Sequence, residues 1–203
     1  MRNVKLLYLA IGLSTIGLIG FIVLGVYSFS GSVAGNSMMS MGNMMNGSGP
    51  VLTKTSVNGL QQKATQGIIN KTNNSISFTQ NNVSLVALAA PPTHKGMYFE
   101  IDNLINPTII VAAGTTINFT LVNEDNVMHG FEVVNAHPPF SAHPMMAYSS
   151  MFNSFIMPIR GTNNSNYYSS STTITTANPG TYSYLCPVPT HAQKGMHGKF
   201  IVG

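Results

Sequence analysis

The stretch from residue 180 to residue 202 reads GTYSYLCPVPTHAQKGMHGKFIV. Its two ends, Thr181–Leu185 and Lys199–Val202, are rich in the aromatic and β-branched residues that favour β-strands. The segment between them contains prolines and glycines and is typical of a loop. That loop carries a cysteine, a histidine and a methionine in the spacing C-x4-H-x4-M: Cys186, His191 and Met196. The pattern predicts a thiol, an imidazole and a thioether close together between two strands.

These three side chains could bind one metal ion, with a further ligand from elsewhere in the chain. His129 is the obvious candidate, because it lies between the end of one expected strand and the start of the next. Two histidines, one cysteine and a distant methionine form the trigonal site with a long axial ligand that is typical of type 1 (blue) copper. Structural zinc fits less well, because a thioether is a poor zinc ligand. His197, beside Met196, is an alternative axial ligand.

Each residue also has a purely structural interpretation. A lone buried cysteine usually behaves as a small hydrophobic side chain, and a methionine often fills a gap in the core. Nucleophilic Cys–His catalysis would need an orienting Asn or Asp and a substrate cleft, and the sequence singles out neither. The combination of spacing, loop context and an upstream histidine favours the metal site over these alternatives.

The rest of the C-terminal region predicts an all-β domain, a β-sandwich or barrel, from about residue 58 to 203. One short helix is expected from Leu60 to Asn70, and an irregular loop with at most one helical turn from Ala136 to Ser170. Further strands are expected at Ser75–Thr79, Val83–Ala89, Tyr98–Asp102, Thr108–Val111, Thr115–Asn123, Gly130–Asn135 and Ser171–Thr176.

Composition narrows the class of protein. Only 7% of the 203 residues are charged, while 44% are hydrophobic. The nine Lys and Arg residues form no run, which argues against a nucleic-acid-binding protein. Five carboxylates leave few groups whose protonation could unfold the protein, so an acidic environment is one hypothesis and a neutral cell-surface protein is the other. The single cysteine excludes an intramolecular disulfide and every site that needs two thiols.

The N-terminal segment, residues 1–30, predicts a membrane anchor. No charge occurs from Leu6 to Phe29, a stretch long enough to span ~30 Å of hydrocarbon. Arg2 and Lys5 precede it, so the positive-inside rule places the rest of the chain on the extracytoplasmic side of the cell membrane. A cleaved signal peptide is the rival interpretation, and both export the domain.

Residues 31–57 resemble a flexible linker rich in Gly, Ser and Met. A methionine cluster between Met38 and Met45 could capture Cu(I), because thioethers bind that ion, or could simply be part of a mildly apolar linker.

Three stretches together resemble the cupredoxins, and within them the sulfocyanin and rusticyanin group of acidophiles: Asn106–Thr116, Gly180–Cys186 and the loop that follows. The N-terminal anchor makes the chain most similar to sulfocyanin. The resemblance covers residues 58–203 and implies a Greek-key β-sandwich that transfers single electrons. Carried over position by position, it implies one copper ion bound by His129, Cys186, His191 and Met196.

Two positions depart from the usual pattern of that group. Thr190 stands where a glycine commonly precedes the loop histidine, so we expect the backbone there to avoid conformations that glycine alone adopts easily. Gly130 stands where Ser or Asn often follows the first histidine, so a side-chain hydrogen bond is missing at that point. We expect this loss to alter the reduction potential and to leave the ligand set intact.

The resemblance implies an electron carrier and not an enzyme. His191 is the expected exit route for the electron, within an uncharged patch made of Pro187, Val188, Pro189 and Ala192. The expected partners are membrane respiratory complexes, either a terminal oxidase or a cytochrome complex.

Three rival functions remain open. The first is a copper chaperone or store that delivers Cu(I), the second is a copper enzyme with a second copper, and the third is a surface protein without metal. Three other histidines rank behind His129 as ligands: His137 and His143 lie in the proline-rich loop, and His94 is expected at the surface.

Overall fold

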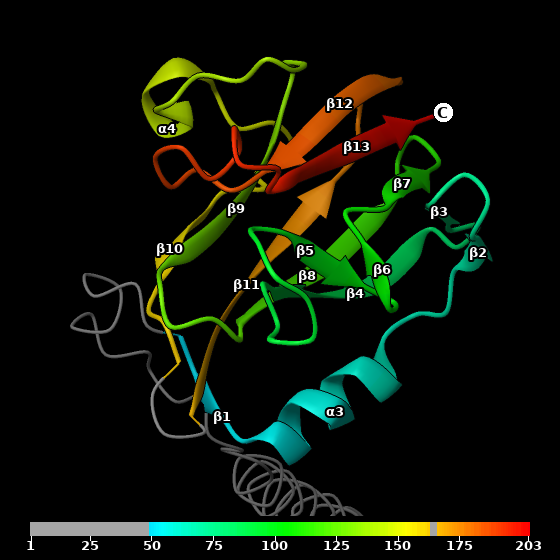
Figure 1. Ribbon diagram of the computed structural model, residues 1–203. Coiled ribbons are helices and arrows are strands. Elements are labelled where there is room, and N and C mark those ends of the chain that lie inside the picture. The colour runs from blue at the N-terminus through cyan, green and yellow to red at the C-terminus, as the bar shows by residue number, and fades with distance from the viewer. Residues whose placement is uncertain (1–48, 163–165) are drawn as a thin grey trace, which may run out of the picture. The chain divides into compact units, whose positions relative to one another are not determined.

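The computed structural model describes residues 49–162 and 166–203, which form two packed β-sheets (Figure 1). The first sheet has six strands in the order β1 (Val51–Leu52), β11 (Tyr167–Thr175), β8 (Thr116–Asn123), β4 (Asn82–Ala89), β5 (Phe99–Ile101) and β6 (Leu104–Ile105). The second has seven in the order β10 (Ile156–Ile159), β9 (His129–Val134), β12 (Gly180–Leu185), β13 (His197–Val202), β7 (Thr108–Val111), β3 (Ser75–Ser77) and β2 (Ile68–Asn70). The expected β-sandwich is therefore confirmed.

Two expectations fall on residues outside the described part, namely the anchor from Leu6 to Phe29 and the methionine cluster from Met38 to Met45. Within residues 49–162 and 166–203, no helix has the length and apolar character needed to cross a membrane.

Every strand expected from the sequence is present, although several ends differ by a few residues. The strands not expected are β1, β2, β6 and β10. The first three are only two or three residues long, too short for a periodic pattern to show. Strand β10 contains Pro158, which cannot donate to a sheet and is tolerated because β10 lies at the sheet edge. It occupies part of the segment expected to be a loop, and α4 (Pro144–Ala147) supplies the single helical turn.

The helix expected from Leu60 to Asn70 is wrong in position. The structure has α3 at Lys54–Lys63, and residues 68–70 belong to β2. The Thr53 hydroxyl accepts a hydrogen bond from the Ser56 amide, which caps the first turn and sets the start of the helix. Residues 51–57, expected to be linker, thus form β1 and the first turn of α3.

Helix α3 covers the outer face of the first sheet (Figure 1). Val57 on the helix is fully buried against Val86 and Val122. At the first turn, the Lys54 ammonium donates to both carboxylate oxygens of Glu124, at 2.7 and 3.0 Å. These contacts attach the N-terminal part of the domain to the end of β8.

The core lies between the two sheets and is rich in aromatic side chains. On β8, residues 117, 119 and 121 alternate inward, as the sequence pattern predicted. Phe119 and Phe131 stack at 4.0 Å between ring centroids, and Phe131 stacks on Tyr184 at 5.7 Å. Tyr184 is fully buried and its hydroxyl donates to the Pro107 carbonyl at 2.7 Å. Aromatic packing therefore joins β8, β9 and β12 near two candidate metal ligands, His129 at the start of β9 and Cys186 directly after β12.

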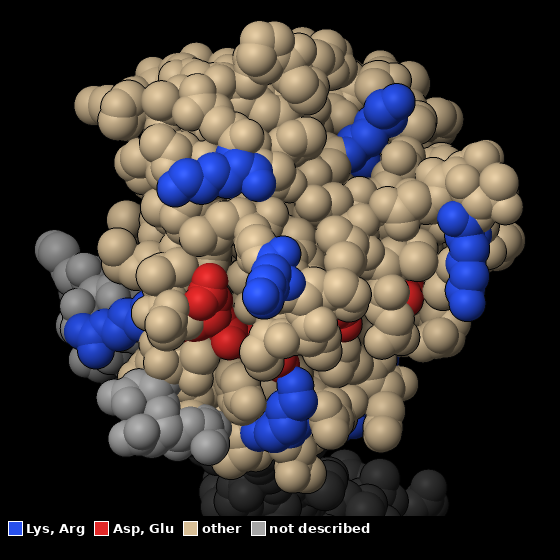
Figure 2. All heavy atoms as spheres, viewed as in Figure 1, with Lys and Arg blue, Asp and Glu red and all other residues tan. Residues whose placement is uncertain are grey.

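Charged side chains are sparse over the described surface. Figure 2 shows lysines and arginines scattered singly, with wide uncharged areas between them. The unusual charged group is Glu132 on β9, which is only 1% exposed and whose Oε1 has no hydrogen-bond partner among the described residues. Burial raises the pKa of the Glu132 carboxyl to about 7, so this group is neutral in acid.

We expect the Glu132 side chain to contribute more to the stability of the fold in acid than at neutral pH. The unfolded carboxyl titrates near its ordinary pKa of 4.5 and the folded one near 7. The contribution of Glu132 to the free energy of unfolding is therefore greatest below about pH 4.5 and falls as the pH rises to about 7, by on the order of 2–3 kcal/mol. Burial lowers the pKa values of His129 and His191, so these two groups contribute with the opposite sign over the same range. The measurement is thermal unfolding of the metal-free full chain, in neutral detergent, across this pH range.

The control is Glu132→Gln, which keeps the shape and removes the titration. The difference in unfolding free energy between the unsubstituted chain and this variant should fall by on the order of 2–3 kcal/mol as the pH rises from about 4.5 to about 7, because the histidine contributions are common to both proteins. Equal pH dependence in both proteins would contradict this role for Glu132.

Candidate metal centre

Three side chains that bind metals converge at one end of the sandwich: His129, Cys186 and His191. The Cys186 Sγ lies 3.8 Å from the His129 Nδ1 and 3.5 Å from the His191 Nδ1, and the two Nδ1 atoms are 3.2 Å apart. His129 and Cys186 have no exposed surface and His191 is 8% exposed. A thiol and two imidazoles thus point their donor atoms at one small volume, which is the arrangement that a bound metal ion requires.

Strand register brings these residues together. His129 is the first residue of β9, and Cys186 follows directly after β12. The two strands pair antiparallel with Leu185 opposite Glu132, so Cys186 arrives beside the beginning of β9. The Gly130 amide lies 3.5 Å from the Cys186 Sγ and donates toward it. The metal site is therefore set mainly by the pairing of two strands that are far apart in the sequence.

The loop from Cys186 to Met196 is closed by its own backbone. The Cys186 amide donates to the Met196 carbonyl at 3.1 Å, and the Met196 amide donates to the His191 carbonyl at 3.0 Å. Met196 is fully buried and belongs to the same core cluster as Cys186. All four residues singled out from the sequence are therefore at this end of the fold, three of them with donor atoms in mutual reach.

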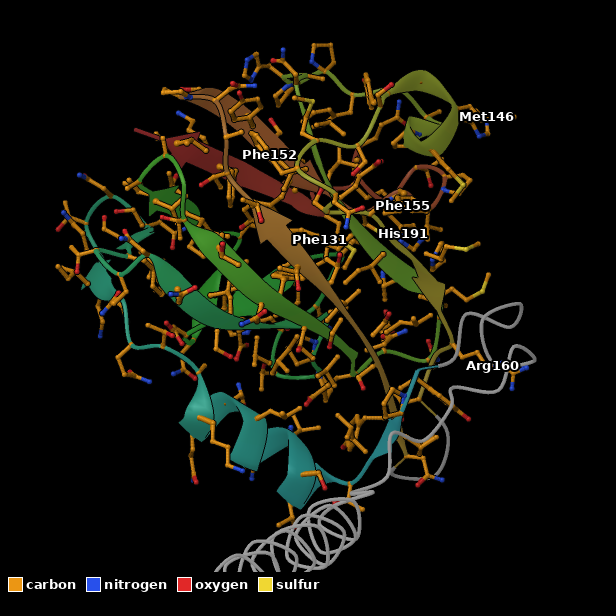
Figure 3. All side chains as sticks on the ribbon, turned by 180° about the vertical axis from the view of Figure 1, so that it is seen from behind. Phe131, Met146, Phe152, Phe155, Arg160 and His191 are labelled. Carbon is orange, nitrogen blue, oxygen red and sulfur yellow. The ribbon has the colours of Figure 1, made fainter. Side chains whose placement is uncertain are left out.

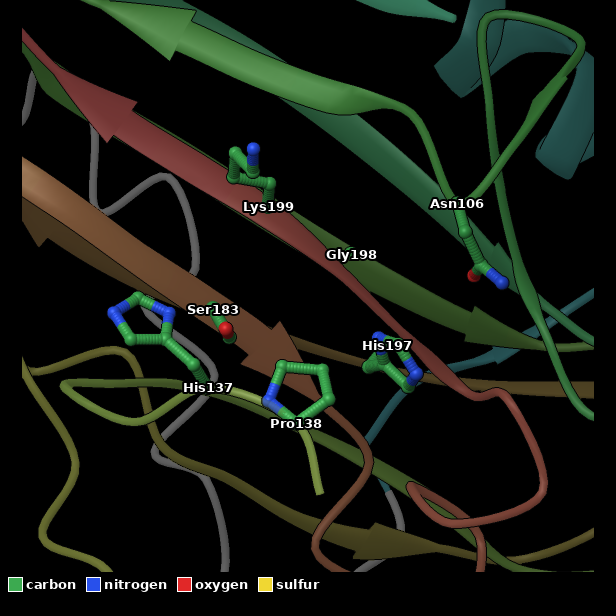
Figure 4. Close-up of a pocket in the computed structure, with 7 residues that line it drawn as sticks. All are labelled: Asn106, His137, Pro138, Ser183, His197, Gly198 and Lys199. Atoms are coloured by element: carbon green, nitrogen blue, oxygen red, sulfur yellow. The ribbon is translucent and has the colours of Figure 1, made fainter. Parts of the chain in front are cut away.

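His197 is not part of this group. It follows Met196, but its ring packs against Phe140, with 4.9 Å between the ring centroids, and lines a different pocket (Figure 4). His137 lines that same pocket, and His143 and His94 are exposed. None of these histidines joins the cluster formed by His129, Cys186 and His191 in the described part of the chain.

Asp125 is a functional residue that the sequence analysis missed. Its Oδ2 lies 3.0 Å from the His129 Nε2, so the Nε2–H can donate to the carboxylate while Nδ1 faces the thiol. A carboxylate on the second nitrogen of a metal-binding histidine fixes its tautomer and orientation. The signal was present in the sequence, because one of only five carboxylates lies four residues before the first candidate ligand.

Burial sets the protonation of the candidate ligands. It lowers the pKa of His129, although Asp125 opposes the effect. Burial, followed by the charges of His129 and Lys194, lowers the pKa of His191 to about 4. Both imidazoles therefore stay neutral and able to bind a metal at a lower pH than a free histidine.

The thiol behaves differently. Burial raises the pKa of Cys186 to about 11, although the backbone N–H groups of Gly130 and Val188 favour the thiolate. The protein alone thus leaves the sulfur protonated at neutral pH, and a bound cation would be needed to hold it as the thiolate.

Gly130 is required by close packing. A Cβ atom at this position would lie 2.6 Å from the Ile156 carbonyl oxygen and 2.9 Å from the Pro187 Cγ. The serine or asparagine hydrogen bond expected in similar proteins is absent because the adjacent strand β10 and the ligand loop occupy that space. The Gly130 amide faces the sulfur instead.

The expectation for Thr190 is wrong. The residue adopts φ 68°, in the left-handed region that glycine favours, although its side chain is β-branched. The Thr190 amide donates to the Ala142 carbonyl at 2.8 Å, and the Thr190 carbonyl accepts from the Lys194 amide at 3.0 Å. These contacts hold the turn in the conformation that places His191, at the cost of backbone strain.

The surface around His191 differs from the expected patch. Pro187 and Ala192 are buried, Val188 is partly buried, and of the four only Pro189 is exposed. Ala192 packs in a small core cluster with Val134, Phe140 and Leu185.

Exposed apolar side chains come instead from segments next to the site. Figure 3 shows Phe155 and His191 at the same end of the sandwich, with Met146 on α4. Met128 directly precedes His129, and Met157 lies on β10, which pairs with β9 around Gly130. The exposed set, which we call the methionine rim, consists of Val127, Met128, Met145, Met146, Phe155 and Met157.

Comparisons with known proteins agree with the fold and the donor set. The family model for the sulfocyanin (SoxE) domain matches residues 71–203. Rusticyanin from Acidithiobacillus ferrooxidans is 33% identical over 129 residues, which make up 63% of this chain and 80% of that protein. Rusticyanin from Acidithiobacillus ferridurans is 32% identical over 129 residues, 63% of this chain and 66% of that protein. The solved structure of rusticyanin from Thiobacillus ferrooxidans is similar with a TM-score of 0.68 and 25% identity, covering 76% of this chain and 96% of that one.

We expect Thr190→Gly to stabilise the protein by up to about 1 kcal/mol, because relief of about 1–2 kcal/mol of backbone strain exceeds the entropy that glycine adds to the unfolded chain. Chemical unfolding of the metal-free full chain measures the difference. Thr190→Ala is the control, since alanine removes the hydroxyl but keeps the strain. Loss of stability in the glycine variant equal to that in the alanine variant would show that the threonine conformation is not strained.

Proposed function

Because the chain belongs to the sulfocyanin (SoxE) domain family of cupredoxins, we propose that it is a membrane-anchored blue copper protein that carries single electrons in a respiratory chain at acidic external pH. The observation that carries the proposal is the convergence of the Cys186 thiol with the imidazoles of His129 and His191. In that role the protein catalyses no reaction of its own.

The residues present fit a type 1 copper ion. His129, Cys186 and His191 would hold the ion, and the Met196 thioether would be a fourth, weaker ligand. When bound, copper supplies a one-electron couple between Cu(II) and Cu(I). Two neutral imidazoles and one thiol suit this ion, because the soft sulfur favours copper and the imidazoles accept either oxidation state.

The protein's own contribution is to hold the ligands still. His129 is fixed by Asp125, Cys186 by the Gly130 amide and Met196 by two backbone hydrogen bonds. The donor atoms of the two histidines and the cysteine are already close together without a metal. Small rearrangement between two oxidation states lowers the barrier to electron transfer, so a pre-arranged site serves a carrier well.

His191 is the proposed exit for the electron. It is the one ligand of the three with any exposed surface, and the methionine rim supplies exposed apolar side chains from segments next to the site. An uncharged, apolar contact of modest area suits a partner that binds briefly and leaves. The proposed partners are a terminal oxidase or a cytochrome complex in the same membrane.

Anchoring would keep the carrier near such partners. The uncharged stretch from Leu6 to Phe29 supports a single-pass anchor, and Arg2 and Lys5 support an extracytoplasmic copper domain. A tether of residues 31–50 would raise the effective concentration of the domain at membrane partners.

The first test is the visible spectrum of the full chain with Cu(II). We expect an intense thiolate-to-copper absorption band that disappears in Cys186→Ser, because the serine hydroxyl cannot supply the charge-transfer donor. His143→Asn, at an exposed histidine of the proline-rich loop, is the matched control and should keep the band.

Met196→Leu should also keep the absorption band but raise the reduction potential, since a donor to Cu(II) is lost. A colourless protein that binds only Cu(I) would favour copper delivery over electron transfer.

The anchor is tested by fractionating cells that express the full chain. We expect the protein in the membrane pellet after alkaline carbonate washing, and at the mass of the uncleaved chain. Replacing two apolar residues of the anchor with arginine, at Ile16 and Ile19, should release it, because each arginine costs about 2.5–3.5 kcal/mol at a helix centre. A soluble, shortened wild-type protein would instead establish a cleaved signal peptide.

A further inference from the structure

The pocket lined by His137 and His197 is polar and lies beside the copper loop, on the outer face of the second sheet. It has a volume of about 270 Å³ and is lined by Asn106, His137, Pro138, Ser183, His197, Gly198 and Lys199 (Figure 4). His197 and Lys199 are two residues apart on β13, so their side chains leave the same face of the strand. Ser183 on β12 is paired directly with Lys199. The pocket thus has a strand-built floor that does not include a copper ligand.

The opposite wall comes from the loop after β9. The Ser183 hydroxyl donates to the Ala136 carbonyl at 2.7 Å, which attaches the loop to β12 next to His137. Figure 4 shows the imidazoles of His137 and His197 on either side of Ser183 and Pro138. His197 is supported by its ring contact with Phe140. Imidazoles from two different elements therefore border the same hollow.

Lys199 is the one formally charged residue among those that line this pocket. Lys199 makes no ion pair with any carboxylate in the described part of the chain. All five carboxylates of the chain lie within the described ranges, and none lines the pocket. The lining therefore offers the ammonium donors of Lys199 and an imidazole N–H from each histidine, with no acidic side chain to neutralise them.

We propose that this pocket binds a divalent tetrahedral oxyanion, sulfate or phosphate. Such an ion is an acceptor with oxygens directed to several sides, which matches donors that approach from β13 and from the opposite loop. Hydrogen bonds between ionised groups are the strong ones, so Lys199 supplies most of the affinity and the two imidazoles supply orientation. A neutral imidazole donates one N–H, so binding does not require either histidine to be protonated.

The test uses the full chain without metal, in neutral detergent at pH 7.5, so that its outcome is independent of copper binding. Sulfate, phosphate, acetate and chloride are titrated at constant ionic strength while imidazole C–H signals are followed by NMR. We expect saturable shifts of the His137 and His197 signals with sulfate or phosphate. The anion that binds more tightly is the one that the pocket prefers.

Lys199→Gln should weaken the binding by about tenfold or more, because one charge-assisted hydrogen bond is lost. The matched control is Lys71→Gln, which makes the same charge change at an exposed turn outside the pocket and should bind normally. The proposal is overturned if the two variants lose affinity equally, if chloride or acetate produces the same saturable shifts, or if no anion moves the two histidine signals.

Discussion

The register between β9 and β12 is the constraint on which the metal centre depends. With Leu185 opposite Glu132, the next residue of the chain, Cys186, reaches the start of β9, where His129 and Gly130 lie. Side chains alternate along a strand, so a slip of β12 by one residue would turn Cys186 away from the imidazoles and carry Tyr184 from the core to the outer face. Stacking of Phe131 on Phe119 and Tyr184 opposes such a slip. Core packing and ligand geometry therefore both require the same register between β9 and β12.

The sequence predicted those features that rest on local patterns. The C-x4-H-x4-M loop identified three residues at the copper end, and strand alternation identified the inward face of β8. What it missed depends on contacts between distant segments. Asp125 gains its role only when the chain brings its carboxylate to the His129 Nε2, and β10 is a strand only because the edge of β9 accepts it despite Pro158. The burial of Pro187 and Ala192 likewise follows from packing that no local pattern records.

The two departures from the family pattern, Gly130 and Thr190, also show how contacts between distant segments act beside local sequence preferences. A glycine is required at position 130 because Ile156 and Pro187 occupy the space that a side chain would need. Neither of these neighbours is adjacent to Gly130 in the sequence. Thr190 shows the reverse case, in which a local preference is overridden. Its hydrogen bonds to Ala142 and Lys194 come from the loop fold, and they hold a β-branched residue at a positive φ that propensity alone opposes.

Three of the five carboxylates have a distinct structural role. Glu124 is paired with Lys54 and Asp125 with His129, whereas Glu132 is buried and its Oε1 has no hydrogen-bond partner in the described part of the chain. The first attaches α3 and the second orients a copper ligand, whereas the third is compatible with its surroundings only when neutral. Burial also keeps the imidazoles of His129 and His191 neutral at lower pH. Burial at the copper site thus keeps the two imidazole ligands unprotonated in acid, and burial likewise keeps the Glu132 carboxyl neutral there.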